Sequence, residues 1–213
     1  MSKLYPCFDE TEAAMISLFG IPKYSTTSYA KTTLLSNFNG KSAKQWLTTV
    51  CEKDSSPYFF IGIGTILKPW WIEVSQSQII NAHSAVLPHA RGIYALENIA
   101  ASQDIEKFQE AAGTTVHYVD SGVDTGPIIR VKKVANPFGF NSIWELKGSI
   151  YSMGFDLLIE VTKNIVSSSG INPVGVSQNL SLKTPNFKQK DFTLHKRKQA
   201  EEGYLAMKSL VAP

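Results

Sequence analysis

Residues 81–92 read NAHSAVLPHARG, and residues 113–129 read GTTVHYVDSGVDTGPII. An amide and an imidazole, Asn81 and His83, stand two positions apart at the end of an apolar stretch. If that stretch is a strand, both side chains point to the same face, because strand side chains alternate. A carboxylate, Asp124, follows 41 residues after His83 in a turn bounded by glycines. This layout suits acyl transfer, which needs a donor for an oxyanion and a group that carries protons.

The pattern around these residues predicts alternating strands and helices. Residues 58–64 (YFFIGIG) form a continuous apolar run, typical of a strand buried on both faces of a parallel sheet. Strands are expected over 58–64, 78–83, 114–120 and 127–135. Helices are expected over 9–19, 41–53, 93–112 (one or two helices), 142–168 and 194–210, with an irregular stretch at 171–193. We therefore predict an α/β fold with an open, mostly parallel, Rossmann-like sheet, whose ligands lie outside the carboxyl ends of the strands.

The length of 213 residues favours one domain with an appendage. We expect a catalytic domain over 1–170 and a basic, partly helical tail over 171–213. Residues 183–208 hold seven Lys/Arg and three Asp/Glu, so this segment carries +4 while the rest of the chain totals −1. The basic character therefore belongs to the tail, either as a solvated face or as a surface for an anionic partner.

Composition indicates a cytoplasmic protein that does not contact a membrane. The apolar fraction is 43%, and no apolar run reaches membrane-spanning length. The first ten residues lack the apolar core of a signal peptide. Cys7 and Cys51 are too few for a disulfide framework, so a reducing compartment is expected.

Four short segments carry a family resemblance. They are Asn81-x-His83, Leu87-Pro88-x2-Arg91-Gly92, Gly113-Thr114-x-Val116-His117 and Asp124-x-Gly126-Pro127. In order and spacing they resemble the 10-formyltetrahydrofolate-dependent formyltransferases, which include glycinamide ribonucleotide transformylase, methionyl-tRNA formyltransferase and nucleotide-sugar N-formyltransferases. The resemblance covers about residues 56–135 well and 1–55 poorly, and it says little about 170–213.

The resemblance implies a Rossmann-like sheet of the formyltransferase type, a one-carbon transferase and 10-formyltetrahydrofolate as formyl donor, with no metal. The relatives carry a first strand–helix unit ahead of the part that aligns with residues 1–20. Nothing in this chain supplies that unit, so either the subfamily lacks it or the chain starts late. A missing strand would leave a sheet edge for a homodimer or a partner chain to cover.

The resemblance also assigns catalytic roles. Asn81 would donate a hydrogen bond to the oxyanion, His83 would carry the proton, and Asp124 would favour imidazolium and position a relaying water. A purely structural alternative makes Asn81 a turn cap, His83 a satisfied strand-end histidine and Asp124 a turn former. This structural alternative accounts for each of the three residues taken alone. It does not account for their occurring together with the flanking motifs.

Ligand-binding residues are expected on two walls and one loop. The folate is expected to contact Thr65, Ile66 and Leu67 on one wall, and Val119, Asp120, Gly122 and Val123 on the other. The substrate loop after the catalytic strand contributes Ser84, His89 and Arg91. Ser84 replaces a proline of the relatives, and Arg91 either is structural or pairs with a substrate anion. His117 is expected to be structural, and a zinc site of His83, His89, His117 and Asp124 matches no compact zinc spacing.

The expected function is formyl transfer to an amine of a small biosynthetic substrate, such as an amino sugar nucleotide or an aminoacyl compound. The purine enzyme is disfavoured because its phosphate-holding start is absent. A tRNA substrate is disfavoured because the 43 residues after Gly170 are too few for the usual C-terminal domain of the tRNA enzyme. Two alternatives remain open: a formyltetrahydrofolate hydrolase that releases formate, and a non-catalytic folate-binding subunit.

Overall fold

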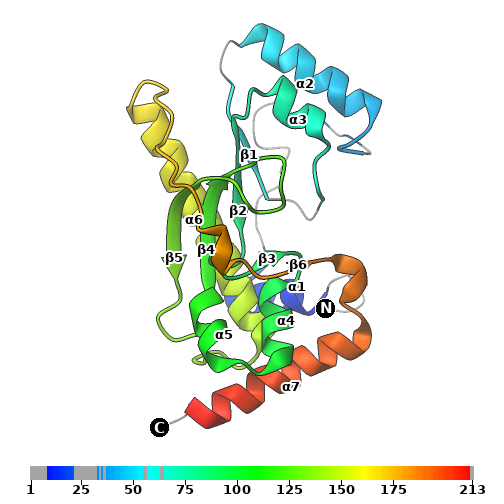
Figure 1. Ribbon diagram of the computed structural model, residues 1–213, viewed down its shortest axis with the longest axis vertical. Helices are drawn as coiled ribbons and strands as arrows, with labels where there is room; N and C mark the ends of the chain where they lie inside the picture. Colours follow the sequence, from blue (N-terminus) through cyan, green and yellow to red (C-terminus); the bar gives the residue numbers. More distant parts are fainter. Residues whose placement is uncertain are drawn as a thin grey trace.

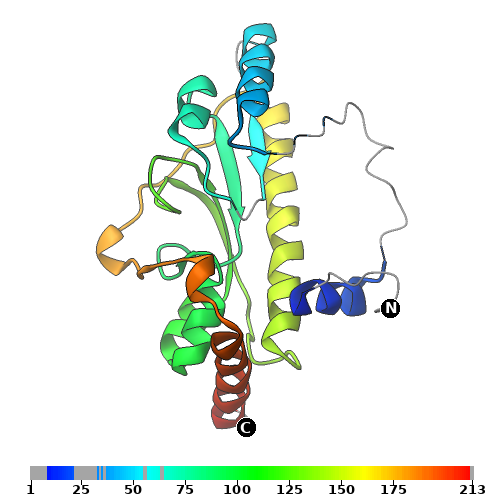
Figure 2. The ribbon, with the colours of Figure 1, turned by 90° about the vertical axis from the view of Figure 1, so that its right-hand side faces the viewer.

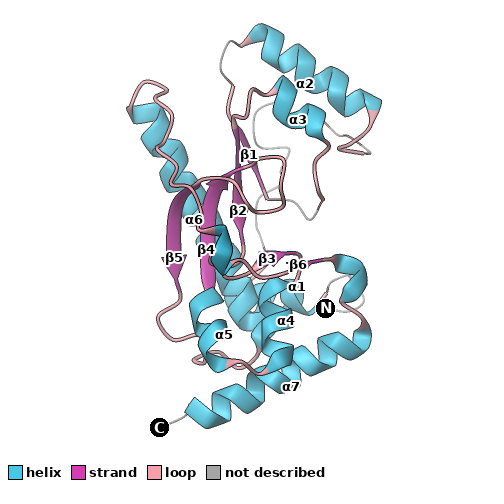
Figure 3. Ribbon diagram, in the orientation of Figure 1, coloured by secondary structure: helices cyan, strands magenta, loops and turns pink. Residues whose placement is uncertain are grey.

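A computed structural model describes residues 9–21, 33, 35, 37–54, 57–62 and 65–211 (Figure 1). Its main sheet has the strand order β1-β2-β4-β5, and a second sheet pairs β3 with β6. The strands are β1 Phe59–Ile61, β2 Ile79–His83, β3 Arg91–Gly92, β4 Gly113–Tyr118, β5 Ile128–Lys133 and β6 Asn186–Phe187. The helices are α1 Glu10–Phe19, α2 Lys41–Lys53, α3 Pro69–Val74, α4 Ala95–Ser102, α5 Ile105–Ala111, α6 Ile143–Ser167 and α7 Leu194–Val211 (Figure 3).

The predicted α/β class is confirmed, and the strand pairing adds detail to it. β1 pairs with β2 in parallel, whereas β4 is antiparallel to both β2 and β5. Only residues 119–127 connect β4 to β5. This connection is too short for the crossover that a parallel pair requires, so β5 must run antiparallel to β4. Within the described main sheet, the parallel pair is therefore β1–β2.

Helix α6 covers one face of the main sheet along its whole length (Figure 2). Its N-cap is Ser142, whose side chain accepts from the backbone N–H of Glu145. The second half of the apolar stripe of α6 packs on the sheet, whereas its first half joins the core formed with α4, α5 and α7. Gly154 allows close approach to the sheet, because a Cβ there would lie 2.8 Å from Thr114 Oγ1. The buried residues of the stripe are Ile143, Leu146, Ile150, Leu157, Val161 and Ile165.

The N-terminal helix α1 carries clear start and stop signals. Asp9 caps α1 by accepting from the N–H of Glu12, while the Glu12 side chain accepts from the N–H of Asp9. This reciprocal capping box is what the spacing predicted. α1 ends at Gly20, whose φ of 79° is a conformation that favours glycine.

The prediction of a strand buried on both faces at 58–64 is wrong in extent and in burial. β1 covers Phe59–Ile61 and is half-buried throughout, while residues 63 and 64 lie outside the described part. The physical reason is position: β1 is the edge of the described sheet and has β2 as its neighbour on one side only.

The C-terminal stretch contains more regular structure than predicted. Segment 171–193 holds two short 3₁₀ turns and the strand β6, which pairs in parallel with β3. The predicted terminal helix is confirmed as α7, and its Tyr204 packs in one core with Phe108 and Phe138. The division into 1–170 and 171–213 stays a prediction. No helix in the described part of the chain is both long and apolar enough to cross a membrane.

Candidate active site

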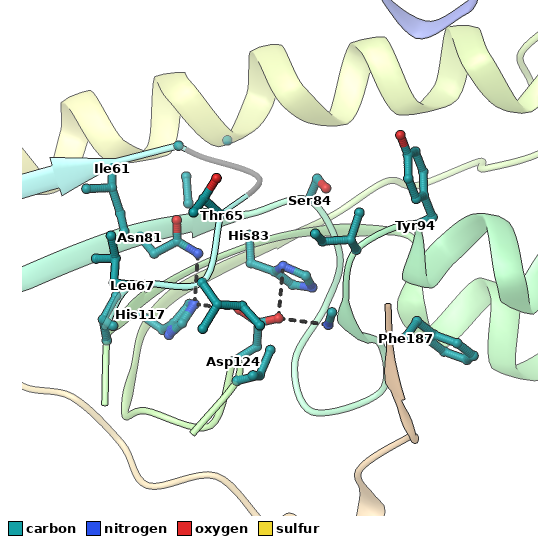
Figure 4. A pocket seen from close by; sticks show the side chains of 18 of the residues that line it. Ile61, Thr65, Leu67, Asn81, His83, Ser84, Tyr94, His117, Asp124 and Phe187 are labelled. Atoms are coloured by element: carbon teal, nitrogen blue, oxygen red, sulfur yellow. Dashed lines mark hydrogen bonds and ion pairs between the residues drawn. The ribbon is translucent and has the colours of Figure 1, made fainter. Parts of the chain in front are cut away.

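The site lies at the carboxyl end of β2, on the wall of a cavity of about 1000 Å³ (Figure 4). Asn81 and His83 both line this cavity, as the alternation along β2 predicted. His117 on β4 stands directly opposite Asn81 in the antiparallel register. Asp124 reaches the same point from the turn between β4 and β5, so the structure brings the three predicted catalytic residues together.

His83 has one nitrogen bound and one available for a proton. Its side chain is buried, and Nε2 lies 2.8 Å from the carbonyl oxygen of Ala90, so Nε2 carries the hydrogen and donates it. Nδ1 lies 3.6 Å from Asp124 Oδ2, which is longer than a hydrogen bond. Nδ1 is therefore the ring nitrogen that does not donate to the protein backbone, and it faces the carboxylate of Asp124.

Asp124 is held as a carboxylate. Burial alone would raise its pKa, but His83, His117, the Gly92 amide and Arg91 together bring the pKa below its ordinary value. The N–H of Gly92 donates to Oδ2 at 2.8 Å. Asp124 is consequently ionised at neutral pH and supplies a fixed negative charge next to His83.

His117 is neutral and orients Asn81. Its Nδ1 donates to the carbonyl oxygen of Tyr118 at 2.7 Å, which leaves Nε2 as an acceptor. Asn81 Nδ2 lies 3.2 Å from that Nε2 and donates to it. Burial lowers the pKa of His117, and Asp124 only partly opposes this effect. The amide nitrogen of Asn81 is thereby fixed, with its second hydrogen free for the cavity.

The predicted folate walls lie on the cavity. Thr65, Ile66, Leu67, Val119, Asp120, Gly122 and Val123 all line it. The first wall is held by Asn39, which donates to the carbonyl oxygen of Ile66 at 2.9 Å and accepts from the N–H of Lys68 at 2.8 Å. Because these bonds go to backbone groups, they do not restrict which side chains occur at residues 65–67.

The second wall is shaped by Asp120. Its Oδ1 accepts from the N–H of Gly122 at 3.0 Å and from the hydroxyl of Thr125 at 2.7 Å. The carboxylate of Asp120 is therefore engaged in the turn, and it makes the local bend that carries the chain from β4 to Asp124.

The predicted substrate residues divide into two groups. Ser84 lines the cavity, on the side of His83 where Tyr94 and Phe187 also lie (Figure 4). His89 and Arg91 do not line it. His89 Nδ1 lies 3.3 Å from Glu110 Oε2, and the Arg91 guanidinium donates to backbone carbonyls. The structure thus brings Ser84 to the site and gives His89 and Arg91 protein partners.

Sequence reasoning missed three residues that contact the site or hold it. His117 was expected to be structural, and the tail residues Gln178 and Thr184 were not considered. Gln178 donates to the carbonyl oxygens of Asp124 and Gly126 at 3.1 and 2.7 Å. Within the described residues, no group of three or more His, Cys, Asp or Glu side chains is arranged to hold a metal ion.

The geometry defines an α/β protein with a histidine–aspartate pair and an asparagine side chain at one cavity wall. Residues 58–137 match the family model described as formyl transferase. The family resemblance read from the four motifs is confirmed.

Curated relatives match part of the chain. The methionyl-tRNA formyltransferase of Microcystis aeruginosa is 27% identical over 145 residues, which are 68% of this chain and 42% of that enzyme. The chain therefore spans less than half the length of this curated relative.

Solved formyltransferases share the fold. The formyltransferase PseJ of Anoxybacillus kamchatkensis, solved with a formamido sugar nucleotide and tetrahydrofolate, has a TM-score of 0.51 at 20% identity, covering 69% of this chain and 77% of that one. An N-formyltransferase of Helicobacter canadensis, solved with folinic acid and dTDP-3-aminofucose, has a TM-score of 0.53 at 20% identity, covering 67% and 54%.

Proposed function

We propose that this protein transfers a formyl group from 10-formyltetrahydrofolate to the amine of a small biosynthetic substrate. The observation that carries the proposal is the convergence of Asn81, His83 and Asp124 on one cavity wall. Asp124 lies 3.6 Å from both His83 and His117, so its charge acts on a ring that can be protonated and on one that stays neutral.

In formyl transfer, Asn81, His83 and Asp124 would each have one role. The amine nitrogen bonds to the formyl carbon, and the bond from that carbon to the folate nitrogen breaks after a tetrahedral intermediate. The free N–H of Asn81 is suited to donate to the oxyanion of that intermediate. His83 Nδ1 is suited to take the proton that the amine loses and to return it to the leaving folate nitrogen. Asp124 stabilises His83 while it is charged.

The cavity fits a folate-type donor. Ile61, Leu67 and Val119 give it apolar walls next to Asn81, and the turn at Asp120–Val123 encloses it on the opposite side. Flat, largely apolar rings with polar edges are bound by such walls together with backbone groups. The bound donor would supply the activated formyl group, while the residues named above orient it.

The choice of acceptor rests on two different kinds of support. The fold likeness to sugar N-formyltransferases and the placement of Tyr94 and Phe187 beside Ser84 favour a small amine. The sequence likeness to methionyl-tRNA formyltransferases favours a second candidate, an aminoacyl-tRNA. An acceptor panel must therefore contain both classes.

The test is release of tetrahydrofolate from 10-formyltetrahydrofolate, with and without amino sugar nucleotides, amino acids and methionyl-tRNA. Release that requires one amine is the expected result, and it names the acceptor class. Release that needs no amine would instead identify a hydrolase. Donor binding without release across the panel would identify a non-catalytic folate-binding subunit.

A further inference from the structure

Segment 173–178 is fastened to the connection that carries Asp124 (Figure 1). The backbones of Val176 and Ile128 exchange two hydrogen bonds of 2.8 Å, and the hydroxyl of Tyr118 donates to the carbonyl oxygen of Pro173 at 2.9 Å. At Gly175 a Cβ would lie 2.7 Å from Pro127 Cβ, so the two strips of chain touch. The segment thus contacts both the end of β4 and the start of β5.

Gln178 binds the backbone on both sides of Asp124. Its Nε2 donates to the carbonyl oxygens of Asp124 at 3.1 Å and Gly126 at 2.7 Å. These two bonds use both amide hydrogens and fix the side-chain orientation. Its Oε1 is buried and has no hydrogen-bond partner within the described residues. Leaving an acceptor unpaired is unfavourable, so the two carbonyls decide which way the amide points.

Arg91, on strand β3, donates hydrogen bonds to the same turn. Its Nη1 donates to the carbonyl oxygen of Val123 at 3.2 Å, and its Nη2 donates to that of Thr184 at 3.0 Å. The following residue, Gly92, donates its N–H to the Asp124 carboxylate. Gly92 has φ of 89° and sits in the β3–β6 pair, where a Cβ would lie 2.2 Å from the carbonyl oxygen of Phe187.

The backbone of Asp124 gains from such support. Its φ of 53° lies in the left-handed region, which residues other than glycine adopt infrequently, although Asp adopts it more readily than most. Neither Gln178 nor Arg91 lines the cavity, so both reach it through the Val123–Gly126 turn that contains Asp124.

We propose that Gln178 and Arg91 are positioning residues that join the C-terminal segment to the Asp124 turn and keep its carboxylate between His83 and His117. The segment after α6 is thereby part of the catalytic apparatus and not an appendage to it. The proposal rests on the proposed function only for its kinetic test.

The first test is independent of activity and follows the amide of Gly92 by ¹H–¹⁵N NMR. Gln178→Met removes both amide hydrogens while keeping a side chain of similar size. Arg91→Lys keeps the positive charge but loses the planar guanidinium that donates to the carbonyl oxygens of Val123 and Thr184. We expect both variants to move the Gly92 resonance toward its position in Asp124→Ala. The matched controls, Ser177→Ala and Arg130→Lys on exposed positions, should leave it in place. An unmoved Gly92 resonance in a folded variant overturns the proposal, and Arg91→Lys decides it if Gln178→Met does not fold.

The second test is kinetic. A misplacement of a reacting group by about 1 Å can cost about a hundredfold in rate. We expect each variant to lower kcat by about 10- to 100-fold, with nearly unchanged KM for the formyl donor and the amine. A shifted Gly92 resonance with unchanged kcat would also overturn the proposal. If the wild-type protein transfers no formyl group, the proposed function fails and the NMR result alone decides the positioning role.

Discussion

Asp124 faces two imidazoles that differ in their capacity to take a proton. His83 has Nδ1 available beside the carboxylate, whereas the pKa of His117 is lowered by burial and its Nε2 accepts from Asn81. One carboxylate thus stabilises a mobile charge on one side and contacts a fixed neutral ring on the other. This asymmetry is what the proposed proton transfer requires.

Removing either the oxyanion donor or the proton carrier should reduce turnover. We expect Asn81→Ala and His83→Ala each to lower kcat by about two to four orders of magnitude, because each removes a group that acts in the transition state. The measurement is tetrahydrofolate release with the identified amine. Asn164→Ala and His195→Ala, at exposed positions, are the matched controls. Wild-type rates in Asn81→Ala or His83→Ala would contradict the site.

His117 should make the protein less stable at mildly acidic pH. Burial lowers its pKa from the ordinary 6.5, so between that value and the folded-state pKa the unfolded chain binds more protons. The stability contribution is present above pH 6.5 and is lost as pH falls toward the folded-state pKa. We expect His117→Gln to reduce the fall in unfolding free energy between about pH 7.5 and 5, measured with urea.

The exposed His195 provides the control for this pH dependence. His195→Gln replaces a histidine at an exposed position and is measured in the same way. An equal slope in His117→Gln and wild type would show that His117 does not titrate differently in the folded and unfolded states.

The sequence predicted the candidate site residues that have a local signature, but not the residues that support them. Asn81 and His83 were found because strand alternation places both on one face, and Asp124 because of its glycine-bounded turn. The pairing of His117 with Asn81 depends on the register between β2 and β4, which are joined by a long connection. Gln178 lies 54 positions from Asp124, and no spacing rule links two such residues.

At the scale of elements, helices α4 and α6 are joined by a buried ion pair. Lys147 Nζ lies 3.0 Å from Glu97 Oε2, and both side chains are almost fully buried. Burial alone would lower the pKa of Lys147, but Glu97 raises it above the ordinary value. Lys147 therefore stays charged at neutral pH.

Replacing one member of this pair should lower the free energy of unfolding more than replacing both. Lys147→Met leaves Glu97 buried without its partner and should lower the free energy of unfolding by about 3–5 kcal/mol. The double variant Lys147→Met/Glu97→Leu should lose less, because no charge remains buried. Urea denaturation measures both, with the exposed Lys163→Met as control. A double variant less stable than the single one would contradict this account.

Helices α4 and α7 approach closely at Gly203. A Cβ at Gly203 would lie 2.1 Å from the carbonyl oxygen of Ala100. Gly203→Ala gains about 1 kcal/mol in helix propensity but must displace a backbone atom, which costs about 1–3 kcal/mol. We expect the clash to win and Tm to fall, while Glu201→Ala at an exposed position leaves Tm nearly unchanged. A higher Tm for Gly203→Ala would show that the helices separate freely.

Elements with strong local signals were predicted within a few residues. The capping box at Asp9 and the long apolar stripe of α6 are properties of the segments themselves. Strands β3 and β6 contain two residues each, so no periodicity marks them. They form because Gly92 permits the close approach of Phe187, a long-range fit that no short window of sequence contains.

On the scale of the whole molecule, the cavity collects residues from distant parts of the chain. Its wall includes α1 residues, the end of β2, the turn after β4, one side of α6 and the stretch at β6. Figures 1 and 2 show α6 on one face of the sheet and the C-terminal segment returning across the other before α7. The α/β class could be predicted from alternating strand and helix patterns. The return of the C-terminal segment across the sheet could not, because it depends on tertiary contacts.

The most direct test of the central claim uses 10-formyltetrahydrofolate labelled with ¹³C in the formyl group. The label on each candidate amine, the labelled formate and the tetrahydrofolate released are measured together, for wild type and His83→Ala. The account predicts that wild type moves the label to one amine in equal amount with tetrahydrofolate, and that His83→Ala moves it far more slowly. Label recovered only as formate, or full transfer by His83→Ala, would contradict it.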